Sequence, residues 1–202
     1  MISRRDLLKQ MGVAGAVAVA SSASAQQRPA SPARQSFDTL TPAEGEVLEA
    51  AVARIIPSDE SGPGAKEAGA AHYIDQALAG PLSGSRAAYT SGLAALDTYA
   101  RSSKGAPFAA LTGADQDAVL ADVEANRVAG TGPGFFLLLR AHTIEGTFAD
   151  PVYGGNTNFA GWDLIGYPGV RVSVSPAEQQ LNVAVPPNHK SAYDFGMFNK
   201  QK

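Results

Sequence analysis

The chain has 202 residues and a net charge of −3, and it lacks a basic block beyond its first few residues, so nucleic acid is not expected as a partner. Hydrophobic residues make up 45% and aromatic residues 7%, a composition typical of a globular protein rather than a disordered one. Because the chain has no cysteine, it holds no disulfide, no thiolate-bound iron–sulfur cluster and no covalently attached haem.

The first 25 residues have the pattern of an export signal. A charged start is followed by a weakly apolar run over residues 11–20, which is too short to anchor the chain in a bilayer, and then by a small-x-small cleavage site. Paired arginines at this place indicate the twin-arginine type of signal, with cleavage after Ala25. The alternative is the amphipathic first helix of a cytosolic domain. The residues that carry the signal are Arg4, Arg5, Leu7, Leu8, Lys9, Ala23 and Ala25.

The twin-arginine route serves proteins that fold, or load a cofactor, before export. This chain has three histidines and no cysteine, which is a poor set of ligands for a metal cluster or a haem. The chain is therefore expected either to fold too fast for export in the unfolded state, or to carry a folded partner across the membrane.

The first predicted helix begins at Thr41 and ends before Pro57. Residues 26–40, rich in Pro, Ser, Ala and Gln, precede it and predict a flexible leader. Thr41 is a good N-cap, Pro42 suits the first helical position, and Glu44 completes a capping box.

Apolar residues at helical spacing predict further helices, which lie at about residues 65–79, 86–101, 112 to before Gly130, and 135–148. The last of these is apolar nearly all round, which predicts a buried central helix. Beyond residue 150 the chain becomes rich in turns, with at most one short strand at residues 170–174. We therefore expect an all-α fold: a single compact domain of about five helices over residues 41–172, including a turn-rich loop region, and an extended tail over residues 173–202.

Two pairs of residues have the i, i+3 spacing with which helices ligate metals. They are His142 with Glu145, and His72 with Asp75. If the pairs converge, they offer a metal site, so a stand-alone periplasmic metal-binding protein or enzyme is one alternative. A hydrogen-bonded core network is favoured over this metal site. The sequence contains neither a nucleophile elbow nor a dinucleotide-binding glycine fingerprint, and no catalytic residue is predicted.

The aromatic and glycine residues after position 150 are candidate partner contacts. Tyr153-Gly154-Gly155-Asn156 predicts an interaction loop or a tightly packed turn. Trp162 and Tyr167 are typical of residues that pin a loop or contact a partner, and a sugar stacked on them is the alternative. The tail either lies along a groove of another protein or is a disordered end. Its candidate contacts are Tyr193, Phe195 and Phe198.

The segments 140–156, 161–162 and 165–169 resemble subunit 3 of the gluconate 2-dehydrogenase family, most specifically in Glu-Gly-x-Phe-x-Asp-Pro-x-Tyr-Gly-Gly-Asn. Residues 40–44 and 55–59 match it as well, while Tyr167 stands where many relatives carry Phe. The resemblance covers most of the mature chain.

The resemblance implies a small subunit without cofactors of its own, peripheral to the inner membrane in the periplasm. A large flavoprotein subunit of the glucose–methanol–choline type holds FAD and oxidises a sugar or polyol, and a cytochrome c subunit passes the electrons on through haem c. The small subunit is expected to bind the flavoprotein, to aid its maturation and to supply the signal read by the twin-arginine translocase.

Overall fold

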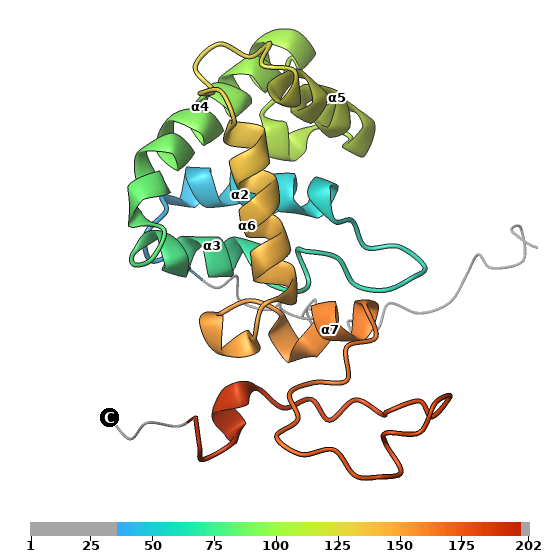
Figure 1. The fold of residues 1–202 in the computed structure, drawn as a ribbon. Coiled ribbons are helices and arrows are strands. Elements are labelled where there is room, and N and C mark those ends of the chain that lie inside the picture. The colour runs from blue at the N-terminus through green and yellow to red at the C-terminus, as the bar shows by residue number, and fades with distance from the viewer. Residues whose placement is uncertain (1–35, 199–202) are drawn as a thin grey trace, which may run out of the picture. The chain divides into compact units, whose positions relative to one another are not determined.

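The computed structural model describes residues 36–198, and their regular elements are helical (Figure 1). The α-helices are α2 (Pro42–Ile55), α3 (Ala70–Leu78), α4 (Arg86–Lys104), α5 (Gly113–Glu124), α6 (Phe135–Phe148) and α7 (Ala160–Leu164). The short 3₁₀ turns are η1 (Ser83–Ser85), η2 (Phe108–Ala110), η3 (Pro151–Tyr153), η4 (Thr157–Phe159) and η5 (Ala192–Asp194). The predicted all-α fold is confirmed.

Three further expectations concern the export signal, a short strand and membrane-spanning helices. The signal residues Arg4, Arg5, Leu7, Leu8, Lys9, Ala23 and Ala25 lie outside the described residues. The short strand expected at residues 170–174 is not formed within the described chain, where Val170 instead donates one backbone hydrogen bond to Lys190. Within residues 36–198, no helix combines the length and the apolar character needed to cross a membrane.

The start of α2 is fixed by the capping box that the sequence predicts. The Thr41 hydroxyl accepts a hydrogen bond from the Glu44 backbone N–H at 3.3 Å, and the Glu44 carboxylate accepts one from the Thr41 N–H at 2.8 Å. Two of the donors that a helix start leaves unpaired are thus satisfied. The helix then buries Val47, Leu48 and Val52 in the core.

Helix α6 contacts most of the other helices, and its most extensive partner is α3. Its inner side chains join a core cluster that includes Leu48, Val52, Ile74, Tyr89, Leu93, Leu96, Phe108 and Leu139. The prediction of a buried central helix is wrong for one face of α6, because Leu137 is 62% exposed and Ile144 is 39% exposed. An apolar sequence thus covers both a core face and an exposed face of this helix.

The second predicted helix, α3, begins at Ala70 rather than at about residue 65. Gly69 takes a left-handed backbone conformation, with φ of 74°, which interrupts helical geometry at that point. The preceding residues form turns instead, in which Ala65 and Ala68 are buried and the Ala65 N–H bonds the Ile56 carbonyl. Helix α4 runs three residues past its predicted end at Arg101, to Lys104.

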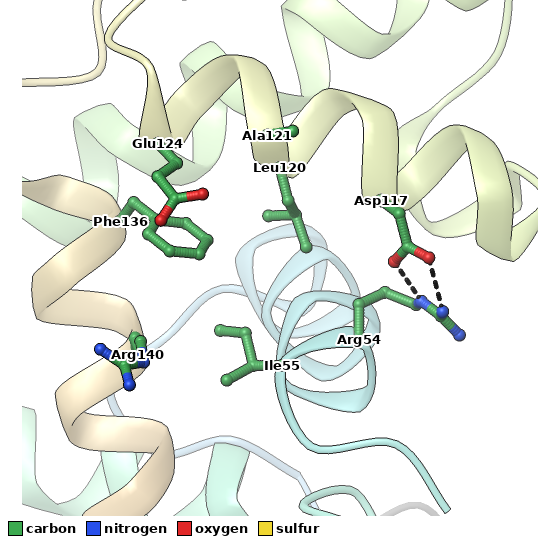
Figure 2. A pocket seen from close by; sticks show the side chains of 8 residues that line it. All are labelled: Arg54, Ile55, Asp117, Leu120, Ala121, Glu124, Phe136 and Arg140. Atoms are coloured by element: carbon green, nitrogen blue, oxygen red, sulfur yellow. Dashed lines mark hydrogen bonds and ion pairs between the residues drawn. The ribbon is translucent and has the colours of Figure 1, made fainter.

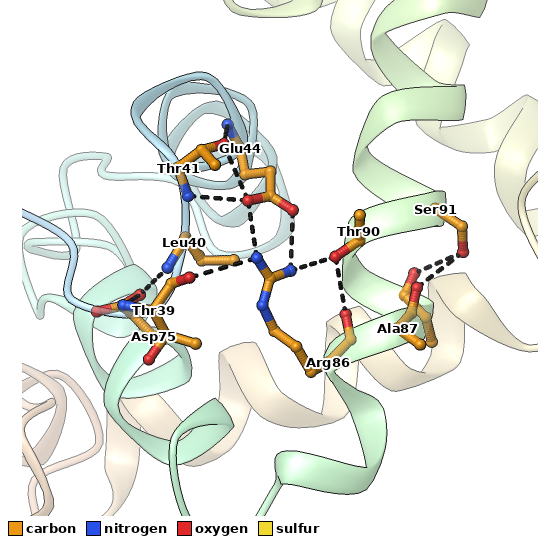
Figure 3. Close-up of polar contacts among 10 residues, drawn as sticks. Thr39, Leu40, Thr41, Glu44, Asp75, Arg86, Ala87, Thr90 and Ser91 are labelled. Atoms are coloured by element: carbon orange, nitrogen blue, oxygen red, sulfur yellow. Dashed lines mark hydrogen bonds and ion pairs between the residues drawn. The ribbon is translucent and has the colours of Figure 1, made fainter.

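Asp75 of α3 holds the segment that leads into α2 (Figure 3). Its carboxylate is 2% exposed and accepts hydrogen bonds from the backbone N–H groups of Asp38 at 2.7 Å, Thr39 at 2.9 Å and Leu40 at 2.7 Å. The buried negative charge is thereby stabilised by three aligned donors. The sequence assigns residues 38–40 to the flexible leader, whereas this contact fixes them against the helical body.

Arg86 of α4 reinforces the same entry segment. Its guanidinium bonds both carboxylate oxygens of Glu44, at 2.8 and 3.0 Å, and the Thr39 carbonyl at 3.3 Å (Figure 3). The bond from Arg86 lowers the pKa of the Glu44 carboxyl from 4.5 to about 2. The start of α2 is therefore tied to α3 through Asp75 and to α4 through Arg86.

We predict that Asp75→Asn lowers the free energy of unfolding by about 2–3 kcal/mol, because an amide offers one oxygen to three donors and turns its own N–H groups toward them. Urea unfolding followed by circular dichroism measures the change. Asp38→Asn is the matched control, since that side chain is exposed and only its backbone contacts Asp75. Equal losses in the two variants would contradict the anchoring role of Asp75.

Candidate partner-binding surface

Asn156 joins the end of α6 to the start of α7. Its side chain is fully buried, and its Nδ2 donates to the Ala149 carbonyl at 2.9 Å. Its Oδ1 accepts hydrogen bonds from the backbone N–H groups of Gly161 at 2.8 Å and Trp162 at 3.3 Å, while its own N–H bonds the Gly146 carbonyl at 2.8 Å. One amide thus satisfies three backbone groups that the turn removes from solvent.

The glycines around this joint allow backbone segments to touch directly. A Cβ atom at Gly155 would lie 2.1 Å from the Gly146 carbonyl oxygen, and a Cβ at Gly146 would lie 2.9 Å from the Ala70 Cα. Neither position has room for a side chain, because backbone atoms occupy that space. Of the two alternatives left open for residues 153–156, the tightly packed turn describes Gly155 and Asn156.

Trp162 supports this joint from inside the molecule. It is 4% exposed, its indole Nε1 donates to the Phe148 carbonyl at 2.9 Å, and its ring meets Tyr167 edge to face at 4.8 Å. A buried indole offers no face on which a sugar can stack. Tyr167, which is 39% exposed, is the part of this pair that meets solvent.

The C-terminal segment returns to the helical body instead of extending freely from it. The Ala192 N–H donates to the Asp150 carboxylate at 2.9 Å, and His189 Nε2 lies 2.7 Å from Asp163 Oδ1. A hydrogen bond with Tyr193 raises the pKa of the Tyr153 phenol, so these two aromatic residues also meet. The tail predicted from residue 173 onward is therefore attached near residues 188–193.

Exposed large apolar side chains are concentrated in the sequence from residue 144 onward. They are Ile144, Val152, Tyr153, Ile165, Tyr167, Val172, Val174, Leu181, Val183, Tyr193, Met197 and Phe198, and we call them the C-terminal apolar surface. In the part of the chain that the structure describes, Leu137 is the other exposed large apolar residue. Exposed apolar residues that gather on one face are typical of a surface that binds another macromolecule, so this stretch of sequence is the candidate for such a surface.

The predicted partner contacts divide between this surface and the interior. Tyr153, Tyr167, Tyr193 and Phe198 are exposed, Phe195 and Gly154 are half-buried, and Gly155, Asn156 and Trp162 are buried. The three buried residues position the surface rather than forming it. Sequence reasoning missed its aliphatic members, because isolated valines and leucines in a loop have the same signature as core residues.

The residues weighed as metal ligands do not meet in one site. Those residues are His72, Asp75, His142 and Glu145. His142 Nδ1 lies 3.1 Å from the Tyr89 hydroxyl, and the Glu145 carboxylate accepts a hydrogen bond from the Tyr73 hydroxyl at 3.2 Å. The His72 ring stacks on Phe37, and Asp75 is occupied by backbone donors. Within residues 36–198, no group of three or more metal-ligand side chains comes together.

A cleft of about 330 Å³ lies between α2, α5 and α6 (Figure 2). It is lined by Arg54, Ile55, Asp117, Leu120, Ala121, Glu124, Phe136 and Arg140. Arg54 holds Asp117 through two hydrogen bonds of 2.7 Å, which lower the pKa of the Asp117 carboxyl. The residues that line the cleft do not combine a nucleophile with a neighbouring base.

The sequence was compared with protein families, with curated proteins and with solved structures. Residues 42–169 match the family described as gluconate 2-dehydrogenase subunit 3. The chain belongs to this family. No curated protein and no solved structure gives a match.

Family membership makes the chain an accessory subunit of a dehydrogenase complex. The matched region runs from the first residue of α2 through α7 and includes the Asn156 joint. It ends at Gly169, before several residues of the C-terminal apolar surface. A subunit of such a complex has protein neighbours, which gives an exposed apolar surface a physical reason to exist.

We predict that Asn156→Ala lowers the free energy of unfolding by about 3–4 kcal/mol, because it leaves buried backbone groups without partners. Asn158→Ala is the control, because Asn158 has a similar positive φ (54° against 47°) but is exposed and makes no side-chain hydrogen bond in the described chain. The control reports backbone strain alone, with an expected loss of about 1 kcal/mol. Chemical denaturation of both variants gives the difference, and similar losses would show that the Asn156 side chain does not hold the joint.

We further predict a pH dependence of stability that His142 causes. Burial lowers the pKa of its imidazole below 6.5, an effect that the Glu145 charge partly opposes. Below about pH 6.5 the unfolded chain therefore binds the proton more readily than the folded chain, so the free energy of unfolding falls as the pH decreases toward the folded pKa.

His142→Asn isolates this contribution, because the Asn amide, which has both a donor and an acceptor, can still hydrogen-bond the Tyr89 hydroxyl while the titrating group is gone. Thermal and urea unfolding between pH 5 and 7 should show a shallower slope in the variant, by up to about one proton. Identical slopes in the two proteins would mean that His142 does not titrate differently in the folded state.

Proposed function

We propose that this chain is the non-catalytic small subunit of a periplasmic FAD-dependent sugar or polyol dehydrogenase. It binds a large flavoprotein subunit of the glucose–methanol–choline type and aids its maturation. It then carries the flavoprotein through the twin-arginine translocase with its own signal, residues 1–25. FAD and haem c belong to the flavoprotein and to a cytochrome c subunit.

The observation that carries this proposal is the C-terminal apolar surface. In a chain of a dehydrogenase-subunit family, a dozen exposed large apolar residues from position 144 onward are best explained by a protein neighbour that covers them. Aromatic residues at its edge, Tyr153, Tyr167 and Tyr193, are of the type enriched in protein interfaces. Hydrogen bonds of the buried Asn156 side chain fix the turn between α6 and α7, so the surface is proposed to be formed before the partner binds.

The polar residues of the body support a structural role. His142, Asp75 and Glu145 each make a hydrogen bond to another group of the chain, and these bonds hold helices or segments together. None of the three lines the described cleft. In the proposed complex the chemistry is therefore assigned to the partner.

We predict that the flavoprotein subunit reaches the periplasm only with this chain. The flavoprotein is expressed alone, with the full chain, and with the Arg4→Lys/Arg5→Lys variant, and each cell fraction is assayed for flavoprotein, bound FAD and dehydrogenase activity. Expression alone should leave it cytoplasmic, poorly soluble and low in FAD. The full chain should give a soluble, FAD-loaded, periplasmic complex.

The lysine variant separates binding from transport. Since lysine keeps the charge but removes the paired arginines, the variant should still solubilise the flavoprotein while leaving the complex in the cytoplasm. The proposal fails if the flavoprotein is equally soluble, active and exported without this chain. It also fails if the mature chain is isolated from the periplasm as a lone monomer with dehydrogenase activity.

A further inference from the structure

Residues 171–187 leave the helical body and return to it as a closed loop, which we call the arm (Figure 1, orange to red). The base of the arm is joined by hydrogen bonds. The Val170 N–H donates to the Lys190 carbonyl at 3.3 Å, and Asn188 donates to the carbonyls of Pro168 at 3.0 Å and Val170 at 2.7 Å. Both ends of the arm are therefore held at one place on the body.

The arm keeps its shape through contacts within itself. Arg171 Nη1 bonds Glu178 Oε1 at 2.7 Å, and its Nη2 bonds the Pro186 carbonyl at 2.5 Å. Glu178 in turn accepts the Ser175 N–H at 2.8 Å. Arg171 and Glu178 are the charged residues of the arm sequence, so the arm has no net charge and its charges are paired.

The apolar side chains of the arm have no place in the core. Leu181 is 91% exposed, and Val172, Val174 and Val183 are each more than 40% exposed. The backbone N–H groups of Ala184 and Val185 make no hydrogen bond to any group of the described chain. A closed, neutral arm with apolar side chains and unused backbone donors has the features of a segment that docks into another protein.

We infer that the arm inserts into an uncharged, apolar groove of the large flavoprotein subunit and contributes to the choice of that subunit. The inference rests on the proposed function. An anionic lipid surface attracts clusters of basic residues, which the arm lacks, and a neutral groove matches its charge. The family match ends at residue 169, so the arm lies outside the shared scaffold and can differ between members that serve different partners.

The test is the affinity of the full chain for the FAD-containing flavoprotein, measured with both purified components. Leu181→Ser/Val183→Ser removes the aliphatic contacts and should weaken binding by about tenfold or more. Thermal unfolding of the free variant should match the wild type, because both side chains are exposed in the free chain. Leu137→Ser, another exposed apolar position, lies on α6 and should change the affinity less than about twofold.

A second variant tests the pre-formed shape of the arm. Arg171→Gln keeps every apolar side chain but releases the ion pair with Glu178. It should weaken binding by severalfold, because the arm must then be ordered on binding. Wild-type affinity in this variant would overturn the inference that the arm docks as a pre-formed element.

The outcomes separate this inference from the proposed function. If the wild-type chain does not bind the flavoprotein, the proposed function fails. If the wild type binds and the Leu181→Ser/Val183→Ser variant binds equally well, only the docking role of the arm is overturned. Binding of the wild type to phosphatidylethanolamine–phosphatidylglycerol vesicles, or its self-association, would also overturn it if the same substitutions abolished that interaction.

Discussion

The buried side chain of Asn156 is the constraint on which the C-terminal half of the structure depends. Its amide oxygen holds the first N–H groups of α7 while its amide nitrogen holds the carbonyl of Ala149 at the end of α6. Neither a shorter nor a purely accepting side chain can make both kinds of contact. The exposed residues that follow, from Tyr167 to the arm, owe their position to this joint.

Helix α3 links that joint to the other end of the domain. Its first residue, Ala70, lies against Gly146 of α6, whose carbonyl binds Asn156. Asp75, one and a half turns later on α3, holds the backbone of residues 38–40. A single short helix therefore supports both the segment that leads into α2 and the turn that precedes most of the C-terminal apolar surface. A substitution that disrupts α3 would therefore destabilise both the segment at residues 38–40 and the turn at Asn156.

Local signals predicted the helices well, whereas contacts between distant segments escaped prediction. Thr41 and Glu44 are three residues apart, so their capping box follows from spacing alone, and the apolar run of α6 gave its bounds. Asp75 bonds residues more than thirty positions earlier, and nothing near it in sequence distinguishes it from a surface carboxylate. The same limit applies to the two histidines. Each has an acidic residue at the spacing of a metal ligand, but in space His72 stacks on Phe37 and His142 contacts the Tyr89 hydroxyl.

The candidate surface was predicted in part for a related reason. Aromatic residues such as Tyr153 and Tyr193 are conspicuous in a turn-rich segment, and they are exposed. Trp162 is equally conspicuous, but whether an aromatic ring faces solvent depends on the carbonyl that its nitrogen finds, here that of Phe148. Leu181, which is 91% exposed, gave no signal, since a single leucine in a loop has the same sequence signature whether it is buried or exposed.

The arm is separate from the core, so the residues that stabilise the fold differ from the apolar residues that are left exposed for a partner. The core side chains Leu48, Leu96 and Leu139 are fully buried by other residues of the chain, so this core is complete within the helical body. Val172, Val174, Leu181 and Val183 of the arm are exposed in the free chain, so these residues gain hydrophobic stabilisation only when another surface covers them. The free energy of association is therefore available from residues that folding does not use. Such an arrangement suits a subunit that must fold first and then hold a larger partner.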